Sequence, residues 1–450
     1  MRVKCWRLAE QIMNRDINML YTKEVKTVET ANRRLLGVYP QKQEGLFMQR
    51  IKIFGGRISW PQWRAVAKLA AAYTSQTPLH LTTRQDIEFH NASAADLPGL
   101  QEGLSAVGLS TFGAGGDSVR NITVCTGCES CGQDIYTLAN VVNTQLAAMP
   151  MITTLPRKFK ISFSACSKAC AKPFINDLGF VAQENGLFAA IGAGSLGSKP
   201  AMGIELYKDL PVSDIVPLCT AAIDFFAEHG DRQNRRKARL RHVRERFGDE
   251  TFKQELDNRF KMLREKSSNQ TIAIENTNQK LKMLARLQLP NGDIAAEDAL
   301  ALADFAESAD LELRINLTHG LELYSRGGRM LPLPPKLTAL TSLPTIVACP
   351  GCKTCPNALT DCCATAEQLR NHLRLNSDTA VHISGCPNDC AQAVVADVGL
   401  IGLTKTIDGK KGPAYRILTN GGRGQTNKPA TEQAVVPAEA VPEYIAKLLF

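Results

Sequence analysis

The sequence predicts a duplicated fold in which both halves of the chain share one pattern of strands, helices and cysteine loops. The segment Phe163–Gly179 is similar to Ile383–Gly399, and Val124–Cys131 is similar to Ala348–Cys355. The matching positions are 220 residues apart in the longer pair and 224 residues apart in the upstream pair. Self-similarity at a nearly constant separation is the signature of an internal repeat.

The regions upstream of the cysteine loops also correspond. Gly56–Phe89 parallels Gly292–Leu323, and each contains a glycine turn, a helix-like run and then a strand-like run in which apolar or β-branched residues recur near period two. The expected helices are residues 60–73 and 296–306, and the expected strands are residues 79–89 and 313–323. Each half is therefore predicted to run strand, helix, strand, cysteine loop, further helix and second cysteine loop.

Two segments fall outside the repeat. Residues 231–279 are charged and helix-favouring with few large apolar residues, which indicates a helical linker or a long surface connection. Its basic stretch Arg232–Arg246 is followed at once by acidic residues and predicts a solvated helix, with no nucleic-acid partner. The stretch Gly421–Pro437 is rich in Gly, Thr, Asn and Pro and is predicted to be loop.

The composition predicts a cytoplasmic globular protein. Hydrophobic residues make up 44% and charged residues 22%, which is ordinary for such proteins. The longest apolar run, Ala393–Leu403, is broken by Asp397, so no membrane span is expected. The N-terminal segment has no continuous apolar core with a cleavage site and does not predict a secretory signal. The net charge of +9 indicates solubility or a site for an anionic cofactor or substrate.

The chain has 14 cysteines, and most of them lie in short clusters. In a reducing compartment such clusters indicate metal binding or catalysis. Each half carries C-x5-C followed by C-x3-C, and four such thiolates can hold a cubane iron–sulfur cluster. If the C-x3-C loops are helical, both sulfurs of a pair face one side. The predicted ligand sets are Cys125, Cys131, Cys166 and Cys170 in the first half, and Cys349, Cys355, Cys386 and Cys390 in the second.

Other interpretations of these cysteines compete. Cys128 and Cys352 create C-x2-C-x2-C runs, which keep a zinc site open. A ferredoxin-type pattern needs a further cysteine followed by proline, but Ile135 and Leu359 stand at that position. Purely structural thiols do not account for a repeated spacing. The remaining cysteines are expected to be packing residues: Cys5, Cys219, Cys362 and Cys363.

The first half carries a set of cations that the second half mostly lacks. Arginine offers a planar fork that suits a carboxylate or an oxyanion, and lysine offers a mobile charge that also supplies protons. A single arginine is by default a surface charge, but five cations beside turn and strand motifs indicate an anion site. They are Arg50, Arg84, Arg120, Lys158 and Lys160, in the motifs QRIKIFGG, TTRQDIEFH, SVRNI and LPRKFK.

With these motifs the sequence resembles the siroheme-dependent sulfite and nitrite reductases over roughly residues 45–425. The combination of C-x5-C…C-x3-C with TTRQ is highly specific. The resemblance extends to GSLGSKP from Gly194, NRRKARL from Asn234 and GGR from Gly421. It implies an α+β pseudo-twofold fold with mixed and antiparallel sheets and helices, and with siroheme held between the halves.

The resemblance also implies roles for single residues. The cluster thiolates come from the second half, and Cys390 joins the cluster iron to the siroheme iron. Thr82, Arg84 and His90 match positions that bind siroheme and its carboxylates. The substrate cations are Arg50, Arg120, Lys158 and Lys160. Such cations stabilise the negative charge that a bound anion gains as electrons arrive, and they deliver protons.

The resemblance divides the chain into five regions. A helical extension covers residues 1–42, a ferredoxin-like paired domain covers 43–113 and 280–343, cluster-motif domains cover 114–230 and 344–450, and the helical linker covers 231–279.

One feature departs from the common assimilatory pattern, because the first half also has a complete cysteine set. A second siroheme facing that set would need cations from the second half. Arg286 matches Arg50, but Thr318, Pro344, Asp378 and Ala380 replace Arg84, Arg120, Lys158 and Lys160. We therefore expect two [4Fe–4S] clusters, the first being a relay or part of a degenerate heme site.

The expected activity is the six-electron reduction of sulfite to sulfide, with nitrite reduction to ammonia as the alternative. Lys158 and Lys160 form a Lys-x-Lys spacing typical of sulfite enzymes, whereas nitrite enzymes often carry asparagine second. An electron-transfer protein with two clusters and no siroheme would leave the first-half cations without a role. No dinucleotide fingerprint is present, so the expected electron donor is a ferredoxin, a flavoprotein or a partner subunit.

Overall fold

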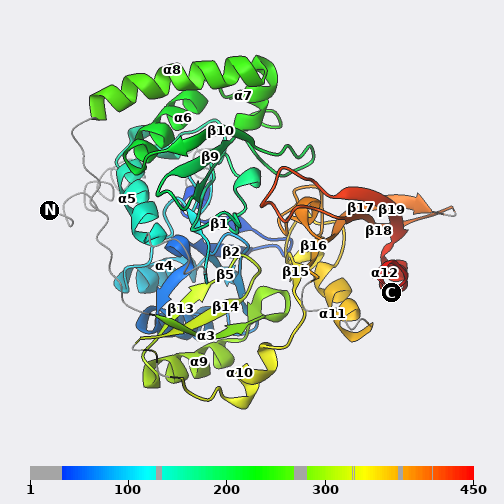
Figure 1. Cartoon of the computed structure of the whole chain (residues 1–450). Coiled ribbons are helices and arrows are strands. Elements are labelled where there is room, and N and C mark those ends of the chain that lie inside the picture. Colours follow the sequence, from blue (N-terminus) through cyan, green and yellow to red (C-terminus); the bar gives the residue numbers. More distant parts are fainter. Residues whose placement is uncertain are drawn as a thin grey trace.

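The computed structural model describes residues 33–127, 134–267, 281–326, 328, 330–372, 379–407 and 409–449. It has three parts: a paired part built from both halves, a first cysteine unit and a second cysteine unit (Figure 1). In Figure 1 the first cysteine unit lies above the paired part, and the second projects to the right. Most of the helical extension predicted at residues 1–42 lies outside the described residues. None of the helices within the described ranges combines the length and apolar character needed to cross a bilayer.

Two sheets form the paired part, and each half of the chain lends one short strand to the sheet of the other. The first sheet contains, in spatial order, β1 (Val38–Pro40), β2 (Leu46–Ile51), β5 (Ile87–Ser93), β4 (Leu79–Leu81) and β12 (Asp293–Ile294). The second contains β11 (Lys282–Leu287), β14 (Leu321–Ser325), β13 (Leu311–Ile315) and β3 (Arg57–Ser59). Thus β12 joins β4 and β3 joins β13, both antiparallel, which ties the halves together.

A left-handed kink precedes each exchanged strand. Gly55 and Gly56 have φ of 55° and 74°, and Asn291 and Gly292 have φ of 59° and 79°. Glycine and asparagine are the residues that adopt this conformation at low cost. At Gly56 a Cβ atom would also lie 2.3 Å from the backbone oxygen of Ile315. The glycine motif therefore fixes how the two halves meet.

The helices α3 (Trp60–Tyr73) and α9 (Ala296–Ser308) pack together over these sheets, so both predicted helices are present. A capping box between Ser59 and Gln62 starts α3. The fully buried Trp63 donates its indole N–H to the Ala299 oxygen at 2.9 Å, across the two halves. The smaller helices are α4 (Leu97–Ala106) and α10 (Pro335–Leu340). The paired part thus has one continuous core.

The predicted strands at residues 79–89 and 313–323 are each a hairpin. β4 and β5 pair antiparallel around a turn, and so do β13 and β14. In the first turn the Thr82 hydroxyl accepts the backbone N–H groups of Arg84 and Asp86. Gln85 closes this turn with φ of 62°. The sequence pattern predicted one strand where there are two with a turn between them, because both strands place apolar residues toward the same core.

The two cysteine units have the same topology, which confirms the predicted duplication. In each sheet the first two pairings, counted from β6 or β15, are parallel and the last two are antiparallel. The first sheet has β6 (Thr123–Val124), β7 (Ile161–Ser164), β8 (Leu178–Ala182), β9 (Phe188–Gly192) and β10 (Ile204–Leu210). The second has β15 (Ile346–Ala348), β16 (Val381–Ser384), β17 (Val398–Ile407), β18 (Lys410–Thr419) and β19 (Thr431–Pro437).

Helices cover these sheets and correct two predictions. They are α5 (Ile135–Ala147), α6 (Ile215–His229), α7 (Leu240–Phe247), α8 (Asp249–Ser267), α11 (Cys362–His372) and α12 (Val441–Leu449). In α8, Phe252, Leu256 and Phe260 recur every four residues and are buried in the core of the first cysteine unit. The segment predicted as a helical linker or a long surface connection is therefore helical, but it belongs to that core as far as it is described. The C-terminal stretch predicted as loop contains β19, which pairs with β18.

Candidate functional site

The site lies where the first-half cations meet the last cysteine loop of the second half. The Thr83 hydroxyl, in the turn of the TTRQ motif, donates to the backbone oxygen of Cys390 at 3.0 Å. Nearby, the Lys42 N–H donates to the Thr354 oxygen at 2.8 Å, in the C-x5-C loop. Residues that are about 300 positions apart in the sequence are thereby held together, as the duplication requires.

Arg50 is placed by strand register. It lies on β2 directly opposite Glu88 on β5, and its Nη2 is 2.6 Å from Glu88 Oε1. Burial alone would lower the pKa of Arg50, but the charges of Glu88, Tyr39 and Asp86 and the hydrogen bond to Glu88 together outweigh it, so the pKa is raised. Burial likewise favours neutral Glu88, yet Arg50 holds the pKa of Glu88 well below its usual value. His90, two residues further along β5, contacts Glu88 through Nε2 at 3.1 Å and is buried.

Arg84 and Arg120 are held mainly by neutral acceptors. Arg84 donates to Asn176 Oδ1 at 2.8 Å and to the Asn121 oxygen at 2.7 Å. Arg120 donates to the Ala114 oxygen at 2.6 Å. Burial lowers the pKa of Arg84 to about 10. Because these hydrogen-bond partners are uncharged, most of the positive charge stays available for another anion.

Lys158 and Lys160 lie just before β7 with the buried Phe159 between them, so alternation puts both ammonium groups on one side. Burial lowers the pKa of Lys158 to about 7, and the charges of Arg239 and Arg120 add to the effect. Burial, followed by Arg84, lowers the pKa of Lys160 well below its usual value. No hydrogen bond or ion pair from either ammonium group occurs among the residues that the structure covers.

Arg239 is a further member of the cation cluster and was not predicted from the sequence. Its Nη2 lies 2.7 Å from Oδ2 of the fully buried Asp177, which also accepts the Lys160 backbone N–H at 2.8 Å. Arg239 and Arg241 are buried, so the prediction of a purely solvated basic stretch is wrong at these positions. The NRRKARL motif could have pointed to Arg239, but the high charge of the whole stretch suggested that every residue in it is exposed to solvent.

The second cysteine set is graded in exposure. Cys386 is buried, Cys349 and Cys355 are half-buried, and the Cys390 side chain is exposed. Burial raises the pKa of Cys386 to about 12, and the nearby Cys390, Cys349 and Cys355 raise it further. Cys390 is accessible to solvent but has protein on most sides, and this partial desolvation raises the pKa of its thiol to about 11, while Lys158 and Lys160 lower it. The four thiols are therefore neighbours, and the accessible one faces the cations.

Four thiolates can hold either a single zinc ion or a four-iron cluster. Within the described ranges no three His, Cys, Asp or Glu side chains converge closely enough to ligate a single ion. A tetrahedral zinc site needs thiolates about 3.8 Å apart, given Zn–S bonds of about 2.3 Å. A four-iron cluster bonds each thiolate to a different iron, so its thiolates stand further apart.

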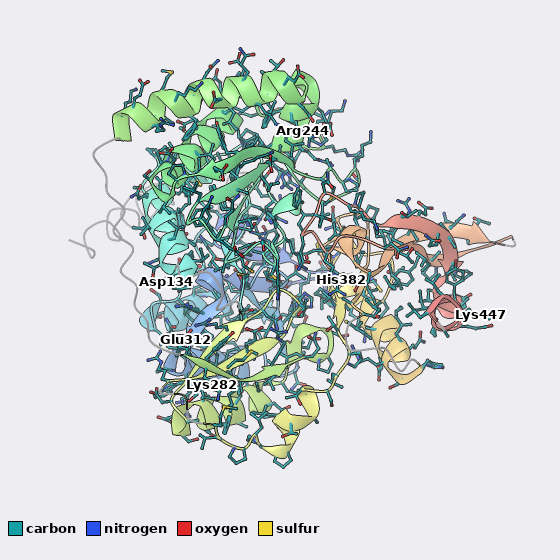
Figure 2. The ribbon with its side chains drawn as sticks, in the orientation of Figure 1. Asp134, Arg244, Lys282, Glu312, His382 and Lys447 are labelled. Atoms are coloured by element: carbon teal, nitrogen blue, oxygen red, sulfur yellow. The ribbon has the colours of Figure 1, made fainter. Side chains whose placement is uncertain are left out.

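The C-x3-C loops are turns and not helices, so the helical arrangement considered for each cysteine pair does not occur. The equivalent residues Ala169 and Asp389 have φ of 51° and 53°, so neither loop continues as a helix. Behind the second loop lies His382 on β16, labelled in Figure 2 near the junction with the rest of the molecule. Its Nδ1 is 2.6 Å from the Ala391 oxygen, and burial lowers its pKa to about 3. This neutral histidine supports the turn.

The first cysteine set repeats part of this arrangement. Cys125 Sγ accepts the Ala165 N–H at 3.0 Å, as Cys349 Sγ accepts the Gly385 N–H at 3.2 Å. The Gln425 amide from the second half lies 3.8 Å from Cys170 Sγ. The other expected ligands are Cys166, which is buried, and Cys131, which lies outside the described residues.

The cation site is not repeated. Arg286 lies opposite Glu322 at 2.9 Å, which copies the Arg50–Glu88 pair. However, 57% of the Arg286 side chain is exposed, and a Cβ atom at Gly127 would lie 3.2 Å from Arg286 Nη2, so Gly127 packs against this arginine. The replacements for the other cations are Thr318, Pro344 and Ala380, whereas Asp378 lies outside the described residues.

The residues present fit a carboxylate-rich cofactor. Among the described residues, several buried nitrogen atoms have no hydrogen-bond partner, and they include Arg84 Nε, Arg239 Nε and His90 Nδ1 in this region. A buried donor without a hydrogen-bond partner lowers the stability of a protein, and such donors are rare in native structures. Together with the unpaired ammonium groups and the accessible Cys390, they form a donor set for an anionic group.

Family models match most of the described chain. The "Nitrite and sulphite reductase 4Fe-4S domain" matches residues 115–263 and 341–449. The "Nitrite/Sulfite reductase ferredoxin-like half domain" matches residues 39–107.

Individual relatives agree with these matches. An "Assimilatory ferredoxin-dependent nitrite reductase" of Haloferax mediterranei is 29% identical, covering 92% of this chain and 80% of its own. A "Ferredoxin--nitrite reductase" of Synechococcus elongatus is 28% identical, covering 90% and 86%. The solved structure of the Mycobacterium tuberculosis NirA protein superposes with a TM-score of 0.78 at 20% identity, covering 92% of this chain and 85% of its own, which supports the fold.

Proposed function

Because the chain belongs to the nitrite and sulphite reductase family, we propose that it reduces nitrite to ammonia with ferredoxin as the electron donor. The family assignment makes it an oxidoreductase that uses siroheme and a [4Fe–4S] cluster. One observation carries the proposal for the site. The TTRQ turn is hydrogen-bonded to the Cys390 loop, and Lys158 and Lys160 lie near the thiol of Cys390, the accessible member of the second-half set.

We assign the cluster to the second cysteine set, namely Cys349, Cys355, Cys386 and Cys390. Cys390 is suited to join the cluster to siroheme because its sulfur is exposed while Cys386 is buried. Arg84, with Thr82 beside it, would hold siroheme carboxylates through its unpartnered Nε. His90 would either hold Glu88 in place through its Nε2 or bind a siroheme carboxylate through Nδ1, which has no partner in the structure.

The bound cofactors supply electrons one at a time, and the side chains of this chain manage charge and protons. Arg50 is charged but paired with Glu88, so it can orient an anion by hydrogen bonding, while Arg84 and Arg120, whose partners are neutral, supply the charge that attracts it. Lys158, with its pKa near 7, can hold and release a proton close to neutral pH. Asp177 fixes the backbone of Lys160 and the guanidinium of Arg239, which sets the spacing of the positive charges.

The choice of nitrite revises the first expectation, which was sulfite. The named relatives are nitrite reductases, so they favour the alternative. Sulfite remains the second candidate because Lys160 is present and lies beside Arg84 and Lys158, which gives the site a dense positive charge. A more highly charged substrate gains more from that second lysine.

The test is anaerobic turnover of nitrite and sulfite by the cofactor-loaded protein. Reduced ferredoxin and reduced methyl viologen should both be used as donors, because the dye bypasses protein docking. We expect a higher kcat/KM for nitrite than for sulfite, with ammonia as the product. A higher kcat/KM for sulfite with both donors would refute nitrite as the substrate. Activity with the dye alone would refute ferredoxin as the donor.

A further inference from the structure

Cys362 is a buried thiol beside the second cysteine set that no function above uses. It is the first residue of α11, and its Sγ lies 3.7 Å from Cys349 Sγ. We propose that Cys362 donates its S–H to the Cys349 thiolate and thereby raises the reduction potential of the cluster. This proposal rests on the assignment of Cys349 as a cluster ligand.

The direction of the hydrogen bond follows from the chemistry of the two sulfurs. A cysteine that binds iron is a thiolate and has no proton to donate. Cys362 therefore has to be the donor. Its other acceptors are more distant, since the Thr360 oxygen is 4.0 Å from the Cys362 sulfur and Thr360 Oγ1 is 3.9 Å away.

A short chain of hydroxyl groups supports this thiol from behind. The Tyr415 hydroxyl lies 4.0 Å from Cys362 Sγ and 3.1 Å from the Thr365 hydroxyl. Both Tyr415 and Thr365 are buried, so their hydroxyl groups need partners within the protein. The Tyr415 O–H can donate to the Cys362 sulfur, which leaves the S–H directed toward Cys349.

The packing leaves little freedom for the thiol. A Cβ atom at Gly385 would lie 3.1 Å from Cys362 Sγ, so the residue before Cys386 has to be small. The Gly385 N–H meanwhile donates to Cys349 Sγ at 3.2 Å. The Cys349 sulfur thus accepts backbone N–H groups of Gly385 and Gly351, and the Cys362 S–H adds a side-chain donor.

The fold itself does not demand a thiol at this position, as the first half shows. Asp134, labelled in Figure 2, caps α5 through the Thr137 N–H, and Asp361 in the same way accepts the Ala364 N–H at the start of α11. Aligned by these caps, Ile135 takes the place of Cys362. Ile135 is buried in the core against which Cys125 packs, and its side chain has no hydrogen-bond donor. The thiol is therefore specific to the cysteine set proposed to work with siroheme.

The consequence is a shift in the potential of the cluster. Reduction adds negative charge to the cluster and its thiolates, and a hydrogen bond to a thiolate stabilises that charge. Loss of the S–H should therefore move the midpoint potential to a more negative value. Electrons would then be harder to accept from a donor of fixed potential.

The experiment is a redox titration of the cluster, followed by electron paramagnetic resonance, in anaerobically prepared holoprotein. Cys362→Ala should shift the midpoint to a more negative value, and Cys362→Ser should restore part of the shift. Cys363→Ala is the matched control, because the Cys363 sulfur faces the backbone oxygens of Cys349 and Pro350 at 3.9 and 3.8 Å. It should leave the midpoint unchanged.

Three results would overturn the role of Cys362. They are an unchanged midpoint in Cys362→Ala at full iron content, an equal shift in Cys363→Ala, and loss of iron from both Cys362 variants only. The last result would show a ligand or a packing role. The titration uses neither nitrite nor ferredoxin, so it is independent of the proposed reaction. Absence of a cluster in the wild type would instead refute the proposed function.

Discussion

Asp177 organises the positive charges of the site, and its replacement by asparagine tests this role. The carboxylate is fully buried and its Oδ2 accepts both Arg239 Nη2 at 2.7 Å and the Lys160 N–H at 2.8 Å. Asparagine has nearly the same shape, and its carbonyl oxygen can still accept both bonds. The change therefore removes the charge and leaves Arg239 buried without a counter-ion.

The expected loss of stability is about 2 kcal/mol, from the range of about 1.5–3 kcal/mol for hydrogen bonds to charged groups. The pseudo-symmetric Asp397 supplies a matched control. It accepts the Ala380 N–H at 2.9 Å and Arg423 Nε at 2.8 Å, but 47% of the Arg423 side chain is exposed. Solvent screens such a pair, so Asp397→Asn should cost about 0.5 kcal/mol.

The assay is the apparent melting temperature of both variants, measured at one scan rate by calorimetry on cofactor-loaded protein. A unit of about 150–250 residues loses about 2–4 °C per kcal/mol. Asp177→Asn should then melt about 4–8 °C lower than the wild type, and Asp397→Asn about 1–2 °C lower. Equal shifts in the two variants would refute the claim that burial makes the Asp177 charge important.

Three further changes test the site. Lys160→Asn should lower kcat/KM for sulfite about tenfold relative to nitrite, because about 1.5 kcal/mol of charge-assisted binding is lost; an unchanged ratio in parallel turnover assays would contradict this. Cys390→Ser should alter the siroheme absorption and the cluster resonance together, and wild-type spectra would exclude the bridging role. Burial raises the pKa of Asp86 to about 6, so its charge appears as pH rises through 6 and offsets Arg50 and Arg84. The KM for nitrite should therefore rise across this range, and Asp86→Asn should flatten the profile; parallel profiles would refute the effect.

The duplication could be predicted from the sequence because the cysteine loops of the two halves have kept the same spacing. The spacing of Cys166 and Cys170 repeats at Cys386 and Cys390, and the sheets around them do have the same topology. The strand exchange between the halves could not be predicted. It depends on which sheet edge each two- or three-residue strand joins, and β3 and β12 are too short to carry a pattern.

The site was predicted where a residue carried its own motif and was missed where its role comes from tertiary contacts. Arg84 stands in TTRQ. Arg239 stands in NRRKARL, but that motif does not show that its side chain is buried against Asp177, which is 62 residues away. Cys362 was expected to be a packing residue because it lies outside the repeated spacing. Its closeness to Cys349 depends on how α11 begins beside β15, which is a property of the folded unit.

The last prediction concerns whether the first cysteine set binds an iron–sulfur cluster or no longer binds one. Cys125 receives a backbone donor just as Cys349 does, and Cys166 is buried like Cys386. Such an environment stabilises a thiolate ligand, so we expect about eight non-heme irons per chain, two four-iron clusters.

Only one siroheme per chain should accompany these irons. The first cysteine loop packs on Arg286, and Thr318 and Ala380 offer no charge to offset further buried carboxylates. Iron and zinc analysis of anaerobic protein, combined with siroheme extraction, tests both numbers. About four irons or one zinc per chain would show that the first set holds no cluster. Two sirohemes would show that Arg286, without matches for Arg84, Arg120, Lys158 and Lys160, supplies enough positive charge for a heme site.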